Sequence, residues 1–97
     1  MNFEWDEEKN NANIRKHGFD FADAWKVFGS QLVIELDDRN DYGEDRWAGV
    51  GLLEGRIVKI IFTEPNENTI RVISLRKAKK YERQHYAETI KDRLGPS

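Results

Sequence analysis

The stretch RWAGVGLLEGRIVKIIFT, residues 46–63, decides the fold because it predicts two strands joined by a tight turn. Glu54-Gly55 lies between two largely apolar runs, 46–53 and 56–63, and a two-residue connection of this kind favours a β-hairpin. The run IVKIIF is apolar at both odd and even positions, which is typical of a central strand covered on at least one face.

The segments on either side of this hairpin predict further strands. EPNEN, residues 64–68, indicates a turn, and TIRVISLR, residues 69–76, indicates the next strand of an antiparallel meander. LVIEL, residues 32–36, is another strand candidate and is followed by a polar loop over 37–45. FEW, residues 3–5, predicts a short first strand that joins the same sheet.

Three helices are predicted from capping residues and apolar spacing. Residues 7–17 follow Asp6 as an N-cap, carry acids in the first turn and bases in the last, and end at Gly18. A second helix is predicted over 21–28, and a third from about 78 to 94. The apolar residues of the second helix recur at i, i+3, i+4 and i+7: Phe21, Ala24, Trp25 and Phe28.

This order of elements predicts one α+β domain over residues 1–97, an antiparallel sheet with two N-terminal helices and one C-terminal helix packed on one of its faces. Ninety-seven residues can build a single core but not two. The chain has no cysteine, no apolar signal region at its N-terminus and no run long enough to span a membrane. We therefore expect a cytoplasmic protein.

Charge is distributed unevenly along the chain. Residues 1–70 hold 8 Lys and Arg against 15 Asp and Glu, a balance of −7, whereas residues 71–97 hold 8 against 3, a balance of +5. Such a division indicates a face that binds a polyanion or docks an oppositely charged partner. The plainer alternative is solvated charge that clusters by accident.

Lysines gather at the start of the last predicted helix. Lys77, Lys79 and Lys80 lie at the positive end of its macrodipole, where each exposed cation costs about 0.3–1 kcal/mol. A bound anion such as phosphate would compensate them, because a helix N-terminus offers free N–H groups. Lys79 and Arg83 fall on the helix side expected to face the sheet and could line a cleft, unless their charged ends reach solvent.

Two arginines lie on the strand before that helix. Strict alternation places Arg76 on one face of the sheet and Arg71 on the other. Arg76, at the strand end beside the lysines, is the stronger candidate for binding an anion. Arg71 is open to two interpretations, a phosphate contact or a structural pair with an acidic loop residue, since the guanidinium fork matches both.

Three stretches together resemble the BrnT family of type II toxin–antitoxin toxins: FEWDEEKNNANIRKHGFDFADAWKVF, DDRNDYGEDRWAGVGLLEGRIVKIIFT and IRVISLRKAKKYERQHY. The resemblance spans roughly residues 3–86 and rests on short motifs in order: W-D-x-x-K, K-H-G, Y-G-E-x-R, G-R, and I-S-x-R-K-A followed by E-R. It implies a RelE-like α+β fold and a ribonuclease that needs no metal or other cofactor. It also implies a BrnA-like antitoxin partner whose complex with the toxin represses their operon.

The resemblance also implies a site. Family members often have an arginine just after the strand matching IIFT, whereas this chain reads Thr63-Glu64-Pro65. The positions that match the family's functional residues are Arg46, Arg71 and Arg76, and the same surface is extended by Lys77, Lys80 and Arg83.

Metal-independent RNA cleavage attacks the phosphate with the neighbouring 2′-OH and needs a base, a cation and an acid. Arg76 and Arg46 are predicted to stabilise the developing charge, and Glu44 is a candidate catalytic carboxylate or a loop salt bridge. His85 is of a type suited to acid–base work, and a metal site is not predicted because the ligand spacings are missing. The residues predicted to hold the RNA backbone are Arg71, Lys77, Lys79, Lys80 and Arg83.

These residues also permit a different class of function. The protein would then be a non-catalytic module that binds protein or nucleic acid through the basic C-terminal surface. An antitoxin should contact apolar surface as well as charge. The candidates for that contact are the edge strand over 32–36 and the aromatic second helix, either of which could instead form a homodimer.

Overall fold

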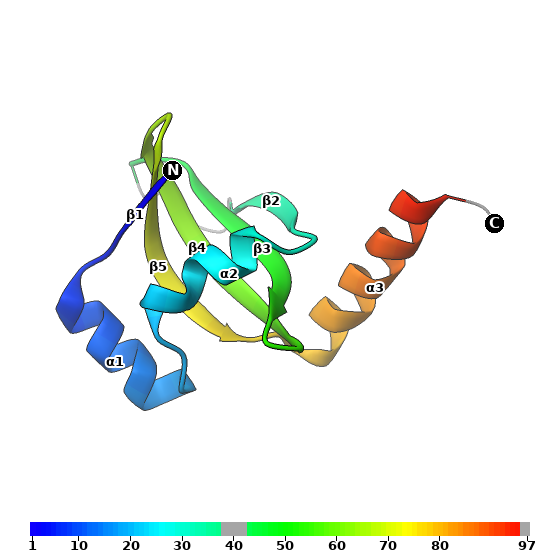
Figure 1. Ribbon diagram of the computed structural model, residues 1–97, viewed down its shortest axis with the longest axis horizontal. Coiled ribbons are helices and arrows are strands. Elements are labelled where there is room, and N and C mark those ends of the chain that lie inside the picture. Colours follow the sequence, from blue (N-terminus) through cyan, green and yellow to red (C-terminus); the bar gives the residue numbers. More distant parts are fainter. Residues whose placement is uncertain (38–42, 96–97) are drawn as a thin grey trace.

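The computed structural model describes residues 1–37 and 43–95, and five strands form one sheet in the order β1-β5-β4-β3-β2 (Figure 1). Neighbouring strands are antiparallel except β1, which runs parallel to β5. The sheet is therefore mixed, and the expectation of a purely antiparallel sheet is wrong at β1. The strands are β1 (Asn2–Glu4), β2 (Val33–Asp37), β3 (Arg46–Leu53), β4 (Arg56–Asn66) and β5 (Thr69–Lys77), and the helices are α1 (Glu7–His17), η1 (Phe21–Asp23), α2 (Ala24–Phe28) and α3 (Lys80–Leu94).

The β3–β4 hairpin confirms the prediction made from residues 46–63. Leu53 pairs with Arg56 across the turn, and Glu54 and Gly55 have φ angles of 50° and 79°, as a two-residue hairpin turn requires. The predicted turn over 64–68 is wrong in its first three residues, because β4 continues to Asn66. The strand pairing is irregular between Thr63 and Asn66, where proline has no N–H to donate.

The first helix forms as its capping residues predict. The Asp6 side chain accepts a 3.0 Å hydrogen bond from the Lys9 N–H, and Gly18 ends α1 in a left-handed conformation at φ 78°. The second predicted helix is divided into a 3₁₀ turn, η1, and the five-residue α2. Trp25 belongs to its predicted apolar stripe but is 59% exposed, since α2 is too short to bury it.

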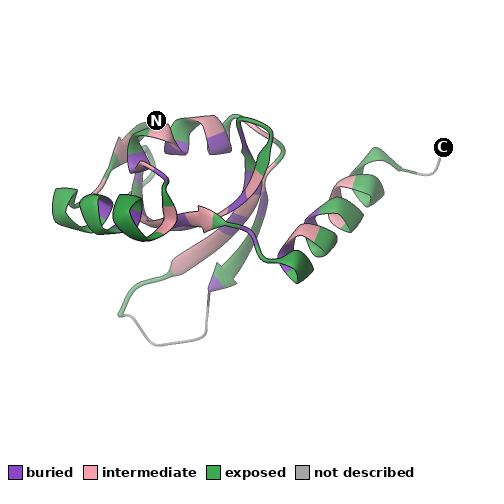
Figure 2. Ribbon diagram, turned by 90° about the horizontal axis from the view of Figure 1, so that it is seen from below, coloured by how far each residue is buried: buried purple, intermediate pink, exposed green. Residues whose placement is uncertain are grey.

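The core lies between one face of the sheet and the segment that holds η1 and α2, and α1 lies beside it against β5 (Figure 2). Val27 of α2 packs close to Gly51 of β3, where an added Cβ would lie only 3.1 Å from the valine side chain. Apolar side chains of β4 and β5 complete this core, and its fully buried members include Phe21, Val27, Val58, Ile60 and Leu75.

The third helix lies on the other side of the sheet. Successive strand residues point to opposite faces, so Val58 and Ile60 of β4 enter the core while Lys59 points away from it. Lys59 pairs with Glu82 of α3, which places the start of α3 on this second face. The expectation that all helices share one face is therefore wrong. Below, the face of the sheet turned away from α1 and α2 is called the open face.

An irregularity in β5 changes which residues share a face. Ser74 pairs with Ile61 but Val72 pairs with Phe62, so Ile73 is an extra residue in this strand. The prediction that the residues of β5 alternate strictly between the two faces of the sheet is therefore wrong. Since Phe62 is in the core, its neighbour Thr63 and the partner of Thr63, Arg71, turn toward the open face. Arg76, the partner of Lys59, lies on that face as well.

Candidate active site on the open face

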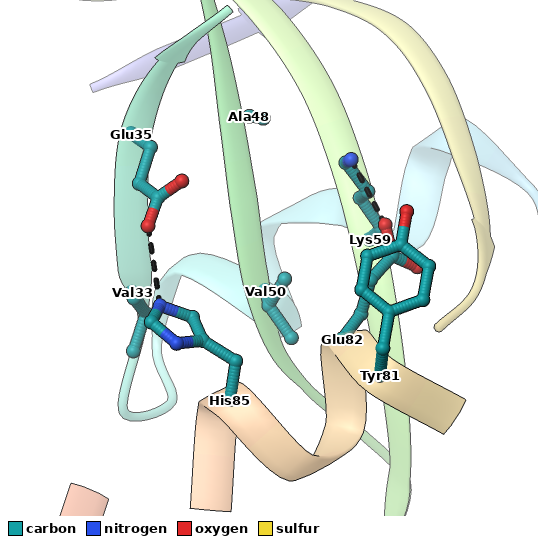
Figure 3. A pocket seen from close by; sticks show the side chains of 8 residues that line it. All are labelled: Val33, Glu35, Ala48, Val50, Lys59, Tyr81, Glu82 and His85. Carbon is teal, nitrogen blue, oxygen red and sulfur yellow. Dashed lines mark hydrogen bonds and ion pairs between the residues drawn. The ribbon is translucent and has the colours of Figure 1, made fainter. Parts of the chain in front are cut away.

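A pocket of about 370 Å³ lies where α3 crosses the open face (Figure 3). Strands β2, β3 and β4 form its floor, and side chains from the first two turns of α3 form its wall. The floor is partly apolar and the wall carries titratable groups, a combination suited to holding and transforming a ligand. The lining residues are Val33, Glu35, Ala48, Val50, Lys59, Tyr81, Glu82 and His85.

Glu82 gathers the cations at the base of this pocket. Its two carboxylate oxygens accept hydrogen bonds of 2.8 and 3.0 Å from the Arg76 guanidinium, and one of them accepts a 2.9 Å bond from Lys59 Nζ. The Lys79 backbone N–H donates a further bond of 2.7 Å. Glu82 is 5% exposed, so these partners compensate a charge that is almost fully removed from water.

The protonation of Glu82 follows from this environment. Burial by itself raises the pKa of a carboxyl group, but the bonds from Arg76, the Lys79 N–H and Lys59 outweigh it and lower the pKa of Glu82 to about 2. The carboxylate is therefore ionised at neutral pH and holds both cations in place.

Glu82 also places an anion at the start of α3, where lysines gather in the sequence. The positions of these lysines predicted an external anion, whereas the structure places a carboxylate of the helix itself at this end, where it accepts a bond from the Lys79 backbone N–H. Glu82 stands in the first turn of α3 and bonds the N–H of its N-cap residue, a favourable position for an acid. Arg83 is also fixed near the start of α3, because its Nη1 donates a 2.6 Å hydrogen bond to the Ala78 carbonyl.

A second polar pair closes the other side of the pocket. His85 Nε2 of α3 lies 3.2 Å from Glu35 Oε1 of β2 (Figure 3). Both side chains are exposed, so a ligand in the pocket can reach them. Tyr81 stands four residues before His85, and this spacing brings two side chains to the same side of a helix, about 5–6 Å apart at Cβ.

The rest of α3 is fixed by contacts near β2. The buried Tyr86 donates a 2.7 Å bond to the Gln31 carbonyl, and Arg93 Nη1 donates a 3.0 Å bond to the Leu32 carbonyl. Burial raises the pKa of Tyr86. Tyr86 therefore anchors the helix and does not open into the pocket.

The remaining predicted site residues lie outside the pocket. Arg71 pairs with Glu4 of β1 at 2.8 Å, which matches the structural alternative for this arginine, although the partner comes from a strand. Arg46 begins β3 and faces Asp37 of β2. It lies four residues along the strand from Val50, or about 13 Å. The other predicted residues, all exposed and none lining the pocket, are Glu44, Lys77, Lys79 and Lys80.

Lys59, Glu82, Glu35 and Tyr81 were not predicted as site residues. Lys59 gave a usable signal, because a lysine within an apolar central strand requires a partner or an opening. Within residues 1–37 and 43–95, no three His, Cys, Asp or Glu side chains converge as a possible metal site. No helix in the same ranges is long and apolar enough to cross a membrane.

Comparison with known proteins gives the class and then the family. A sequence model of the ribonuclease toxin, BrnT, of type II toxin–antitoxin systems matches residues 5–82. The crystal structure of the Brucella abortus ribonuclease toxin, BrnT, is similar to this chain at 34% sequence identity and a TM-score of 0.65, over 82% of this chain and 99% of that one. No match was found among curated proteins.

The chain therefore belongs to the BrnT family of ribonuclease toxins. The family match ends in the first turn of α3, so it includes Lys59, Arg76 and Glu82, whereas His85 lies three residues beyond its end.

Proposed function

We propose that this protein is a toxin that cleaves RNA at the α3 pocket without a metal ion and so inhibits translation and growth. Membership of a ribonuclease toxin family supports RNA as the substrate. The observation that carries the proposal is the His85–Glu35 pair, which stands over a pocket whose base holds the cation Lys59. A base, a cation and an O–H donor thus line one cavity.

His85 would act as the general base. With Nε2 held by Glu35, its Nδ1 is left to take the proton from the ribose 2′-OH, and the carboxylate stabilises the imidazolium that forms. The 2′-oxygen then forms a bond to phosphorus and the P–O5′ bond breaks, which leaves a 2′,3′-cyclic phosphate and a 5′-OH end. Tyr81 would supply the proton to O5′ from its place one helical turn away.

Lys59 would stabilise the charge that develops on the phosphoryl oxygens. It lines the pocket, whereas Arg76 lies behind it in a bidentate pair with Glu82. Glu82 would therefore be a positioning residue that fixes both cations. Arg76 was predicted to stabilise the developing charge itself; here we propose that it supports the site from behind the pocket, through Glu82.

The other basic residues would extend the RNA-binding surface. Arg46 and Arg71 lie on the open face at a distance from the pocket, where they could contact phosphates of neighbouring nucleotides. Glu44, two residues before Arg46, would add a negative charge at the end of the sheet where β3 begins. The lysines predicted to hold the backbone surround the start of α3: Lys77, Lys79 and Lys80, with Arg83 beside them.

We also infer the setting in which the protein acts. A type II toxin is paired with an antitoxin protein, and the resemblance to BrnT supports a BrnA-like partner that represses the operon together with the toxin. The complex would lie in the cytoplasm and could contain two copies of the toxin.

Cleavage of a 5′-labelled single-stranded RNA in EDTA tests the proposal. We expect the wild type to leave 5′-OH ends, and His85→Ala to reduce the rate about 10²–10⁴-fold because the general base is lost. Gln84→Ala, the exposed neighbour on α3, is the matched control and should cleave normally. Equal rates for the wild type and His85→Ala would remove His85 from the mechanism, and no cleavage by folded wild type would favour a non-catalytic binding module.

A further inference from the structure

Strand β2 has an open edge. It is the last strand in the sheet order, and among the described residues only β3 pairs with it. The outward N–H and C=O groups of an edge strand are a template for another strand. Proteins usually protect such edges with lysine, proline or a covering segment, whereas β2 reads VIELD, which contains neither lysine nor proline.

An apolar surface continues from this edge onto the core side of the sheet. Ile34 and Leu36 are 46% and 49% exposed and pair with Gly49 and Trp47. Because α2 has only five residues, the sheet beside them is not fully covered, and a groove of about 220 Å³ lies there. Its lining is apolar apart from one glutamate: Met1, Phe28, Leu32, Ile34, Phe62, Glu64 and Ile70.

The other side of β2 is acidic and disfavours a second copy of the chain. Val33, Glu35 and Asp37 alternate with the exposed apolar pair, and the strand contains no base. Antiparallel pairing of two β2 strands about Glu35 would set the two Glu35 carboxylates directly opposite each other, which is destabilising. A strand with Lys or Arg on this side and apolar residues on the other would complement both faces.

We propose that the edge of β2 binds an extended segment of the antitoxin in which apolar residues alternate with Lys or Arg. This inference rests on the proposed function, since it takes the antitoxin as the partner. The added strand would extend the sheet, place its apolar side chains beside Ile34, Leu36 and the groove, and place its basic side chains beside Glu35.

The same contact would act on the candidate active site. Glu35 lines the pocket and holds His85 at 3.2 Å, so a cation from the antitoxin beside Glu35 competes with that pair. A strand along β2 would also border the pocket entrance on its open side. Binding at this edge thus couples antitoxin capture to the loss of RNA cleavage.

Hydrogen exchange in the complex tests the backbone pairing without any variant. The probe is the purified antitoxin of the same operon, and the readout is the exchange rate of the amides in 33–37. Pairing should slow the outward amides about tenfold or more in the complex. Unchanged exchange in 33–37 when other segments become protected would overturn the proposal, and so would an antitoxin that does not bind the wild type.

A matched pair of variants tests the apolar contact. Ile34→Lys/Leu36→Lys should weaken binding of the antitoxin about tenfold or more, while its RNA cleavage stays at the wild-type rate and resists inhibition. Leu52→Lys places lysine at another exposed leucine, on β3, and should alter neither measurement. Equal antitoxin affinity for the wild type and the double variant would contradict the proposal.

These measurements separate failure of the inference from failure of the proposed function. If the wild type does not cleave RNA, the ribonuclease mechanism fails, but exchange and affinity still report whether β2 pairs with the antitoxin. The double variant could bind the antitoxin more weakly for another reason, namely that a second toxin copy covers β2. If sedimentation and hydrogen exchange of the wild type show such a copy on β2, the partner named here is wrong.

Discussion

The two faces of the sheet are stabilised in different ways. On the core face, β4 places Val58, Ile60 and Phe62 in an apolar cluster with α2, and the buried Asn13 of α1 bonds the backbone of Leu75 beside it. On the open face the same strand places Lys59 against Glu82, which is just as deeply buried as many core residues. One strand thus contributes to a core on one side and to a charged site on the other.

The difference shows how each face is stabilised. Apolar packing is non-directional, so the apolar cluster of the core face depends mainly on side-chain volume and on the alternation of the strands. The open face depends on specific geometry. Hydrogen bonds from Arg76, Lys59 and the Lys79 N–H together offset the free-energy cost of burying the Glu82 carboxylate. We therefore expect substitutions on the core face to affect folding alone, and substitutions on the open face to affect folding and chemistry separately.

The largest effect on stability should come from the core face. Phe62→Ala removes a buried ring that meets the Phe28 ring edge-on at 4.9 Å, and it should lower the free energy of unfolding by about 3–5 kcal/mol. Urea unfolding followed by far-UV circular dichroism measures this. Leu52→Ala, at an exposed leucine, is the control and should cost less than about 1 kcal/mol. Similar losses for both would mean that Phe62 does not anchor the core.

Loss of the central carboxylate should have the next largest effect. Glu82→Ala leaves Arg76 and Lys59 half-buried without their partner and should cost about 3 kcal/mol of unfolding free energy. Glu88→Ala, at an exposed glutamate of the same helix, should cost little by comparison. If the two variants unfold at the same urea concentration, the charged cluster is not part of the stability of the open face.

Acid should weaken the wild type through the same group. The folded pKa of Glu82, about 2, is below its ordinary value of 4.5, so its contribution is complete above pH 4.5 and is lost as the pH falls toward 2. Between those limits it amounts to about 3 kcal/mol, of which only part is lost by pH 3. Urea titrations from pH 6 to 3 should show a shallower decline for Glu82→Gln than for the wild type. Parallel declines would contradict the low pKa.

The smallest effect on stability is expected at the far end of the open face. Arg71 and Glu4 form a pair that is nearly half exposed on both sides, so Arg71→Ala should cost less than about 1 kcal/mol. If Arg71 also holds the RNA backbone, the variant should bind RNA more weakly, most visibly at low salt. Fluorescence anisotropy with a labelled RNA measures this, and unchanged affinity at every salt concentration would leave Arg71 as a structural residue only.

The sequence predicts the parts of this fold that depend on near neighbours in the chain. The turn at Glu54-Gly55 and the caps of α1 are decided by a few adjacent residues, and both form as predicted. The extra residue in β5 is not visible in the same way, because it depends on how the strand pairs with β4. That one residue brings Arg71 and Arg76 to the same face, against the alternation expected from β5 alone.

The candidate site depends still more on distant contacts. The basic character of the segment from Arg76 onward is plain in the sequence, and Arg76 does lie behind the pocket, bonded to Glu82. The residues that line the pocket are separated in the chain: Lys59 comes from β4, Glu35 from β2 and His85 from α3. Sequence spacing along any one element could not reveal this convergence, nor that the anion at the start of α3 is Glu82.

Lys59 offers the most direct test of the division between the two faces. Lys59→Met keeps the length of the side chain and removes one bond to Glu82, so the variant should lose some unfolding free energy but stay folded, because Arg76 and the Lys79 N–H still bond Glu82. Its single-turnover rate on labelled single-stranded RNA in EDTA should fall about 10²–10³-fold, since a charge aimed at the phosphate is lost. Cleavage at the wild-type rate by folded Lys59→Met would contradict the assignment of the chemistry to the open face.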